Sequence, residues 1–157
     1  MSRPLILITP GDPAGIGPEV IAKALASPEL PQHCDYEVLP SGSGFTVGQP
    51  DEISARIALD ALEEAARRLR QGTADAVVTG PVSKENLQAI GFPYPGQTEF
   101  FADALGVKDY GMLLTGATLS VGLATIHEPL ALVPELLTVE RITRIGLLTA
   151  GYAQRVG

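Results

Sequence analysis

Residues 75–106 read DAVVTGPVSKENLQAIGFPYPGQTEFFADALG, and the rest of the chain is arranged around them. The apolar run Ala76–Val78 predicts a buried strand, which breaks at the turn Thr79-Gly80-Pro81 and gives way to a polar helix start. A turn rich in glycine and proline over 91–96 precedes a second helix start at 97–101. Because open α/β sheets bind ligands in loops beyond the carboxyl ends of their strands, we expect the chemistry of the protein in this region.

A second strand–loop–helix unit lies at the start of the chain. Leu5–Ile8 is a continuous apolar run, which is typical of a strand buried on both faces of a sheet. It ends in a loop over 9–18 with three glycines and three prolines, and Pro18 fits the first turn of the helix that follows. Gly15 and Gly17 form a Gly-x-Gly pair, but the third glycine of the dinucleotide-binding fingerprint is missing, so we reject that fingerprint.

The remainder of the chain continues the alternation of strands and helices. A weak strand is expected over 35–39, and the longest helix is expected to start with Asp51 as its cap. Strands are expected over 110–115 and 119–125, either as a hairpin or as adjacent strands, and an amphipathic helix over 138–156. This alternation predicts an α/β fold of three layers, with a mainly parallel sheet and flanking helices.

The charge of the chain argues against nucleic acid as a partner. The 157 residues carry a formal net charge of −7 at pH 7. Proteins that bind nucleic acid neutralise phosphates with clustered lysine and arginine, and this acidic chain shows no such cluster. A small anionic ligand remains possible, because single lysines and helix N-termini attract anions locally.

The cysteine content and the hydropathy of the chain exclude further classes of protein. Cys34 is the only cysteine, which excludes an internal disulfide and a cysteine-rich zinc site, and we interpret it as a small apolar residue. No apolar run approaches the ~20 residues that span a bilayer, and the start of the chain lacks a signal-peptide pattern. We therefore expect a cytoplasmic protein with no membrane partner.

Four motifs together resemble one enzyme family: ITPGDPAGIGPEV at 8–20, DAVVTGPVSK at 75–84, GFPYPGQTEFFADALG at 91–106 and LATIHEPL at 123–130. They are similar to motifs of the 4-hydroxythreonine-4-phosphate dehydrogenase family, which serves pyridoxal 5′-phosphate biosynthesis. The resemblance implies a homodimer with a fold like that of isocitrate and isopropylmalate dehydrogenases. It also implies NAD or NADP as cofactor and a divalent metal (zinc, magnesium or cobalt). The implied reaction oxidises and then decarboxylates a small phosphorylated substrate, 4-phosphohydroxy-L-threonine.

The resemblance covers nearly all of this chain but only the N-terminal half of a family member. It implies that residues 1–157 form a single α/β domain, in which a few dozen residues of the family pattern are missing near 36–45. Past Gly157 the family continues for roughly as much chain again. That part carries further metal-binding histidines and much of the cofactor site.

The resemblance assigns roles to individual polar residues of this chain. His127 aligns with the family's first metal-binding histidine, and Lys84 aligns with an active-site lysine that would orient a carboxylate or phosphate. We therefore predict His127 as a metal ligand and Lys84 as the catalytic residue. Gln97 and Thr98 stand where the family usually has His-Thr contacting the substrate. Gln97 departs from the pattern, because a glutamine carries no charge and cannot shuttle a proton.

Other residues have two interpretations each. Gly11 and Asp12 are weak candidates for cofactor binding; alternatively, Gly11 serves backbone shape and Asp12 caps the next helix. Thr98 could instead be the N-cap of the helix that follows it. If the chain carries the family's active site, Lys84, Thr98 and His127 should face one common cleft.

Two hypotheses for the function follow. The first is an NAD-dependent, metal-assisted dehydrogenase. The second is a truncated or vestigial non-catalytic domain of the same family, or a relative that acts on another phosphorylated hydroxy acid. His33 and His127 are the only histidines, so this chain alone cannot supply a site of three histidines. That shortage favours the second hypothesis for the chain alone, and Gln97 leaves the exact substrate open.

Overall fold

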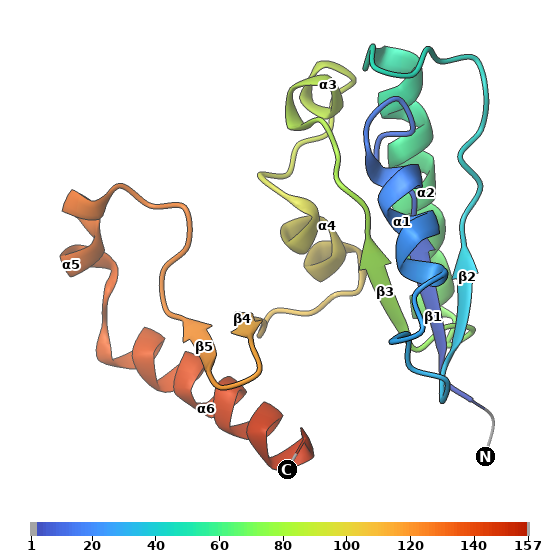
Figure 1. Ribbon diagram of the computed structural model, residues 1–157. Helices are drawn as coiled ribbons and strands as arrows, with labels where there is room; N and C mark the ends of the chain where they lie inside the picture. The colour runs from blue at the N-terminus through green and yellow to red at the C-terminus, as the bar shows by residue number, and fades with distance from the viewer. Residues whose placement is uncertain (1–2, 157) are drawn as a thin grey trace. The chain divides into compact units, whose positions relative to one another are not determined.

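The computed structural model describes residues 3–156, which form two compact units that divide between Gly106 and Val107 (Figure 1). The first unit contains the glycine-rich loop and the predicted substrate-binding residues. The second contains the predicted metal ligand. The prediction that residues 1–157 form a single α/β domain stays a prediction.

A three-stranded parallel sheet forms the centre of the first unit. β1 (Leu5–Thr9) lies between β2 (Asp35–Val38) and β3 (Ala76–Thr79). Leu7 of β1 is fully buried, as its apolar run predicted, because it packs against Leu39, Ala61 and Ala65. The helix that follows β1, α1 (Gly17–Leu25), is largely exposed. The predicted α/β fold with a parallel sheet and flanking helices is confirmed in this unit.

The long helix α2 (Glu52–Arg70) starts at the predicted cap. The backbone N–H of Ser54 donates to Oδ1 of Asp51 at 2.9 Å, and the backbone N–H of Asp51 donates to Oγ of Ser54 at 3.0 Å. Each residue thus satisfies an amide group that the first helical turn leaves unpaired. This reciprocal pair fixes where α2 begins.

Two clusters of buried side chains place α2 between the sheet and the helices α3 (Lys84–Ala89) and α4 (Gln97–Ala104). The cluster on the sheet side consists of Leu7, Leu39, Ala61, Ala65 and Ala74. The cluster on the other side consists of Ala55, Leu59, Leu62, Ala66, Leu87, Phe92 and Phe100. Because both clusters share α2, the starts of α3 and α4 are held in place relative to the sheet.

The second unit combines a β-hairpin with helices. β4 (Met112–Thr115) and β5 (Ser120–Leu123) pair antiparallel, so the hairpin is the correct one of the two predicted arrangements. The 3-10 turn η1 (Leu130–Leu132) and the short helix α5 (Val133–Leu136) were not predicted. The final helix, α6 (Val139–Val156), agrees with its prediction within a residue.

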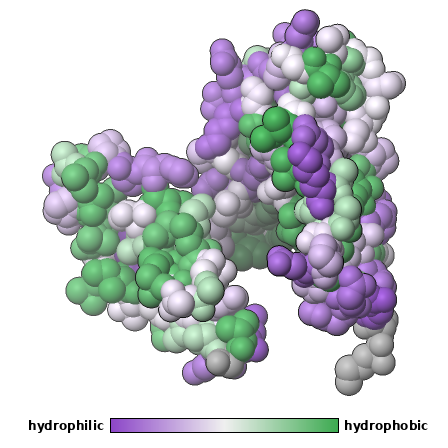
Figure 2. All heavy atoms as spheres, in the orientation of Figure 1, coloured by the Kyte–Doolittle hydropathy of each residue, from purple (hydrophilic) through white to green (hydrophobic). Residues whose placement is uncertain are grey.

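The surface of the second unit is rich in apolar side chains (Figure 2). Ile145 of α6 is buried and packs close to Gly111 and Gly122. The exposed large apolar residues on and before α6 are Leu130, Leu132, Leu137, Val139, Ile142, Leu147, Tyr152 and Val156. Within residues 3–156, no helix has the length and hydropathy needed to cross a membrane.

Candidate functional site

Two loops meet at the carboxyl ends of β1 and β3. Thr9 and Thr79 end these strands as register partners. Beyond them, the backbone N–H of Gly80 donates to the carbonyl of Thr9 at 2.9 Å, and that of Asp12 donates to the carbonyl of Pro81 at 2.8 Å. The structure therefore joins two motifs that are distant in the sequence, at the sheet edge where parallel α/β folds bind ligands.

Two glycines allow this close contact between the loops, and a third allows the loop after β1 to fold against itself. A side-chain carbon on Gly11 would lie 2.2 Å from the carbonyl oxygen of Pro81, and one on Gly80 would lie 2.5 Å from that of Pro10. A side-chain carbon on Gly17 would lie 2.1 Å from the same Pro10 oxygen. The space beside Gly11 is thus filled by backbone rather than open to a cofactor phosphate. Cofactor binding at Gly11 stays a prediction.

Asp12 is a buried carboxylate in the loop after β1, and 3% of its surface is exposed. Its Oδ1 accepts a hydrogen bond from the backbone N–H of Ala14 at 2.9 Å, which shapes the loop. Its Oδ2 has no hydrogen-bond partner among residues 3–156. The alternative that Asp12 caps α1 is wrong, because Ile16 occupies the N-cap position and no side chain caps this helix.

Gln97 connects the start of α4 to the loop after β3. Its Nε2 donates to the carbonyl oxygen of Gly80 at 3.3 Å. Its Oε1 is shielded from solvent and has no hydrogen-bond partner in the described part of the chain. Thr98, the next residue, is exposed. The alternative that Thr98 is the N-cap is wrong, because the extended residue Gly96 occupies that position.

The turn that leads into α4 is fixed by aromatic packing. The rings of Phe92 and Tyr94 have centroids 5.2 Å apart, and both rings also pack against Phe100. The hydroxyl of Tyr94 donates to Oδ2 of Asp103 at 2.5 Å, and this bond raises the pKa of Tyr94. These contacts tie the turn to α4 and so hold its first residues, including Gln97, in place.

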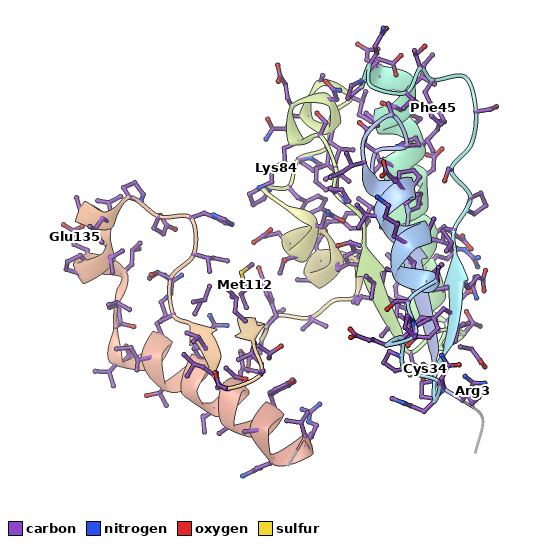
Figure 3. All side chains as sticks on the ribbon, viewed as in Figure 1. Arg3, Cys34, Phe45, Lys84, Met112 and Glu135 are labelled. Atoms are coloured by element: carbon purple, nitrogen blue, oxygen red, sulfur yellow. The ribbon has the colours of Figure 1, made fainter. Side chains whose placement is uncertain are left out.

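Lys84 is the first residue of α3 and lies three residues beyond Pro81 (Figure 3). Ser83 is the N-cap of this helix, and its Oγ accepts a hydrogen bond from the backbone N–H of Asn86 at 3.3 Å. Lys84 is exposed, and none of the ion pairs formed within residues 3–156 includes it. Its ammonium group is therefore available to an anionic ligand.

His127 lies in the second unit, in the loop after β5. Its φ is +56°, and it is the one non-glycine residue with a positive φ in the described part of the chain. Residues 3–156 contain no group of three His, Cys, Asp or Glu side chains that could hold a metal. His127 thus offers a single ligand by itself. A common cleft for Lys84, Thr98 and His127 stays a prediction, because His127 belongs to the other unit.

Thr9 is a site residue that the sequence analysis missed. It is fully buried, and its Oγ1 has no hydrogen-bond partner among the described residues. The signal was a hydroxyl-bearing residue directly after the apolar run Leu5–Ile8. Because buried polar atoms in native proteins are nearly always paired, an unpaired one at this edge indicates a place for a ligand or another part of the protein.

Comparisons with known proteins agree with these motifs. A family described as pyridoxal phosphate biosynthetic protein PdxA matches residues 17–157. A 4-hydroxythreonine-4-phosphate dehydrogenase from Synechocystis sp. is 37% identical, over 100% of this chain and 57% of the relative. One of the same name from Geobacter metallireducens is 37% identical, over 90% of this chain and 54% of the relative.

A solved structure is also similar. The crystal structure of 4-hydroxythreonine-4-phosphate dehydrogenase from Klebsiella pneumoniae matches with a TM-score of 0.84 and 26% sequence identity. The match covers 99% of this chain and 60% of that one. The chain thus spans about half the length of the curated relatives it matches. The resemblance inferred from the four motifs, and its restriction to the N-terminal half, are confirmed.

Proposed function

The chain belongs to the family of pyridoxal phosphate biosynthetic protein PdxA, and we propose that the protein carrying it is a 4-hydroxythreonine-4-phosphate dehydrogenase. Its substrate is 4-phosphohydroxy-L-threonine, which is oxidised and then loses carbon dioxide. When bound, NAD or NADP accepts the hydride, and a divalent metal polarises the substrate oxygens. The observation that carries the proposal is the match to dehydrogenases of this name along the whole chain.

The exposed residues beside the loop after β3 support a phosphorylated substrate. Lys84 is exposed and forms no ion pair within the described residues, so its charge is free to orient a phosphate or carboxylate. Thr98 exposes its side chain in the first turn of α4, where unpaired backbone N–H groups also favour an anion. We therefore assign Lys84 to catalysis and Thr98 to substrate binding, with Gln97 beside it.

His127 is the proposed metal ligand of this chain. Its positive φ supports the assignment, because constrained backbone of this kind is concentrated at functional sites. Histidine nitrogen suits zinc or cobalt better than magnesium, which prefers oxygen ligands. Since residues 3–156 hold no group of three ligand side chains, His127 alone does not make a metal site. The other ligands have to come from outside this part of the protein.

The cofactor fits the described residues less well. Gly11 faces the carbonyl oxygen of Pro81, and Asp12 is buried and donates its backbone N–H to the same oxygen. Most of the NAD or NADP site would then be built by chain outside this half. For the fold of the whole protein, we propose similarity to isocitrate and isopropylmalate dehydrogenases. We also propose that this chain lacks a few dozen residues of the family pattern near 36–45.

The apolar surface of α6 supports a homodimer. Leu147 is 70% exposed and Ile142 is 53% exposed, although both are large and apolar. The hollow beside α6 and the hairpin is lined mainly by apolar and small residues, namely Gly122, Ala124, Ile142, Ile145, Gly146, Thr149, Ala150 and Ala153. Contiguous exposed apolar residues often mark interfaces between proteins. We therefore assign this face to a second copy of the chain.

Two observations favour the alternatives. The absence of a three-ligand group among residues 3–156 favours a non-catalytic domain for the chain alone. Gln97, in the place of the family's histidine, favours a relative that acts on another phosphorylated hydroxy acid. In both cases the fold and the anion-binding loop are retained.

Turnover separates these possibilities. We expect no NADH from the purified 157-residue chain with 4-phosphohydroxy-L-threonine, NAD and a divalent metal, and steady NADH from the product of the complete open reading frame. A chelator should abolish the second signal, and added metal should restore it. If the complete protein turns over another phosphorylated hydroxy acid but not 4-phosphohydroxy-L-threonine, the proposed substrate is wrong and the other acid replaces it. If the complete protein turns over none of these phosphorylated hydroxy acids, the alternative of a non-catalytic domain is favoured.

A further inference from the structure

The connection between β2 and α2, residues 40–50, is tied to the loop after β1 by a short hydrogen bond. The backbone N–H of Gly48 donates to the carbonyl oxygen of Ala14 at 2.7 Å. Ala14 is only 1% exposed, whereas Gly48 is exposed. Within residues 3–156, this is the one hydrogen bond between the connection and the rest of the first unit. An exposed segment therefore pairs a buried carbonyl of the candidate site.

The donor belongs to a tight turn that needs a positive φ. The backbone N–H of Gln49 donates to the carbonyl of Thr46 at 3.0 Å and closes a turn over 46–49. Gly48 occupies the third position of this turn with a φ of +81°, which glycine and asparagine tolerate best. A side-chain carbon on Gly48 would meet nothing within 4 Å. Position 48 is therefore restricted by backbone conformation and not by space.

The connection has few contacts that would hold it closed. None of its residues is buried, and Val47, at the tip of the turn, is 76% exposed. A side-chain carbon on Gly44 would come no closer than 3.8 Å to Ile53 of α2. Phe45 of the connection and Lys84 both lie at the upper end of the first unit (Figure 3). Segments of this kind open locally while the domain stays folded, so the turn can leave Ala14 without unfolding the sheet.

Backbone and side-chain bonds lead from Ala14 to the loop after β3. The backbone N–H of Ala14 donates to Oδ1 of Asp12 at 2.9 Å, and the backbone N–H of Asp12 donates to the carbonyl of Pro81 at 2.8 Å. Lys84 follows Pro81 by three residues and begins α3. The turn at 46–49 is thus connected, through the loop after β1, to the segment that carries the proposed catalytic lysine.

We propose that the turn 46–49 is a latch on the loop after β1, and that Gly48 is a positioning residue for the anion site at Lys84. This rests on the proposed function, in which a phosphorylated substrate binds at Lys84. When the latch opens, the buried carbonyl of Ala14 loses its partner, and the loop has to move to pair it again. The substrate therefore binds more tightly to the closed state, and by linkage it holds the latch closed.

Hydrogen exchange of single amides tests this coupling without a mutation. In the 157-residue chain, saturating 4-phosphohydroxy-L-threonine should slow exchange of the Gly48 amide about tenfold, because opening of the latch then weakens the bound ligand. The control is the amide of Gly72, which donates to Leu69 at 3.1 Å beyond the other end of α2. Its exchange rate should not change.

Substitutions at Gly48 test the latch from the other side. Gly48→Val should weaken binding of the same substrate about tenfold in calorimetric titration, because a β-branched residue resists a positive φ and opens the latch. Gly48→Asn tolerates that φ and keeps the amide, so its affinity should stay within about twofold of the unmutated chain.

Gly44→Val is the matched control. Gly44 lies in the same connection and has a φ of +94°, but within residues 3–156 it makes no hydrogen bond to the loop after β1. The two valine variants should therefore lower the unfolding midpoint by similar amounts, whereas Gly44→Val should change binding less than about twofold. This difference separates positioning of the site from a merely structural role.

The outcomes distinguish the latch from the proposed function. Substrate binding with unchanged exchange at Gly48, or equal weakening by Gly44→Val and Gly48→Val, would overturn the latch and leave the dehydrogenase proposal intact. Equal loss in Gly48→Asn and Gly48→Val would also overturn it, because backbone conformation would not be the cause. Failure of the unmutated chain to bind the substrate would count against both proposals.

Discussion

Gly11 and Pro81 lie backbone against backbone, so that a side-chain carbon on Gly11 would be 2.2 Å from the carbonyl oxygen of Pro81. The contact joins the loop after β1 to the loop after β3, and the next residue, Asp12, donates to the same oxygen. Lys84 follows on the second loop. The placement of the proposed catalytic lysine therefore depends on a glycine in the other motif.

Gly11→Ala should destabilise the chain by more than about 2 kcal/mol, because the new carbon meets Pro81 and the residue has a φ of +73°. Gly72→Ala is the matched control. Gly72 also has a positive φ, +66°, but a side-chain carbon there would meet nothing within 4 Å. It should cost only about 1 kcal/mol. Urea unfolding measures both, and equal losses would show that the loops separate freely.

The ion pair between Glu37 and Arg68 should make stability depend on pH. Hydrogen bonding from Arg68 lowers the pKa of Glu37. Its contribution is then complete above the ordinary carboxyl pKa and is lost as pH falls through the lowered value. Because Glu37 is 46% exposed, the contribution should be below about 1 kcal/mol.

Unfolding of Arg68→Gln at several pH values measures this contribution. The stability difference from the unmutated chain should shrink between about pH 7 and about pH 3. Arg56→Gln, exposed on the same helix, should show no such trend. A difference that grows on acidification would contradict the assignment of the shift to Arg68.

Leu147→Glu should weaken the proposed homodimer. A charge at a residue that is 70% exposed alters the free chain little but is costly when a partner buries it. Analytical ultracentrifugation of the chain should show a shift to monomer, with an unchanged circular dichroism spectrum. Ile16→Glu, at an exposed apolar residue of the first unit, is the control. The assignment of α6 to a second copy fails if the mass stays the same for both variants.

Gln97→His tests which end of the substrate meets the start of α4. An imidazolium attracts the phosphate or carboxylate that the start of α4 favours, so binding of 4-phosphohydroxy-L-threonine should tighten more at about pH 6 than at about pH 8. Weaker binding at the lower pH would mean that the ammonium end of the substrate meets this position, because like charges repel. Unaltered binding at both values would show that position 97 does not touch the ligand.

Local patterns were enough to predict most elements of the fold. The run Leu5–Ile8 predicted β1, and Asp51 predicted the start of α2, because strand burial and helix capping depend on neighbouring residues. Thr98 was a false cap because Gly96, with an extended backbone, took the position. The sequence left the pairing of β4 and β5 open, since apolar runs of this length fit both arrangements.

The contacts of the candidate site were harder to predict. The sequence and its resemblance named Lys84, Gln97 and Asp12, but the bonds among their loops join residues distant along the chain. No local pattern indicates that Gly11 meets Pro81 or that Gln97 reaches Gly80. Thr9 was missed for the same reason, because its lack of a partner becomes visible only when the surrounding atoms are in place.

Mapping the substrate onto the chain tests the central claim most directly. In an ¹H–¹⁵N spectrum of the 157-residue chain, 4-phosphohydroxy-L-threonine should shift the amide resonances of Asp12, Gly80, Lys84 and Thr98. The resonances of Cys34, which directly precedes β2, and of Asp60, which is exposed on α2, should not shift. Shifts confined to this second group, or to neither group at saturating ligand, would contradict a substrate site at the carboxyl edge of β1 and β3.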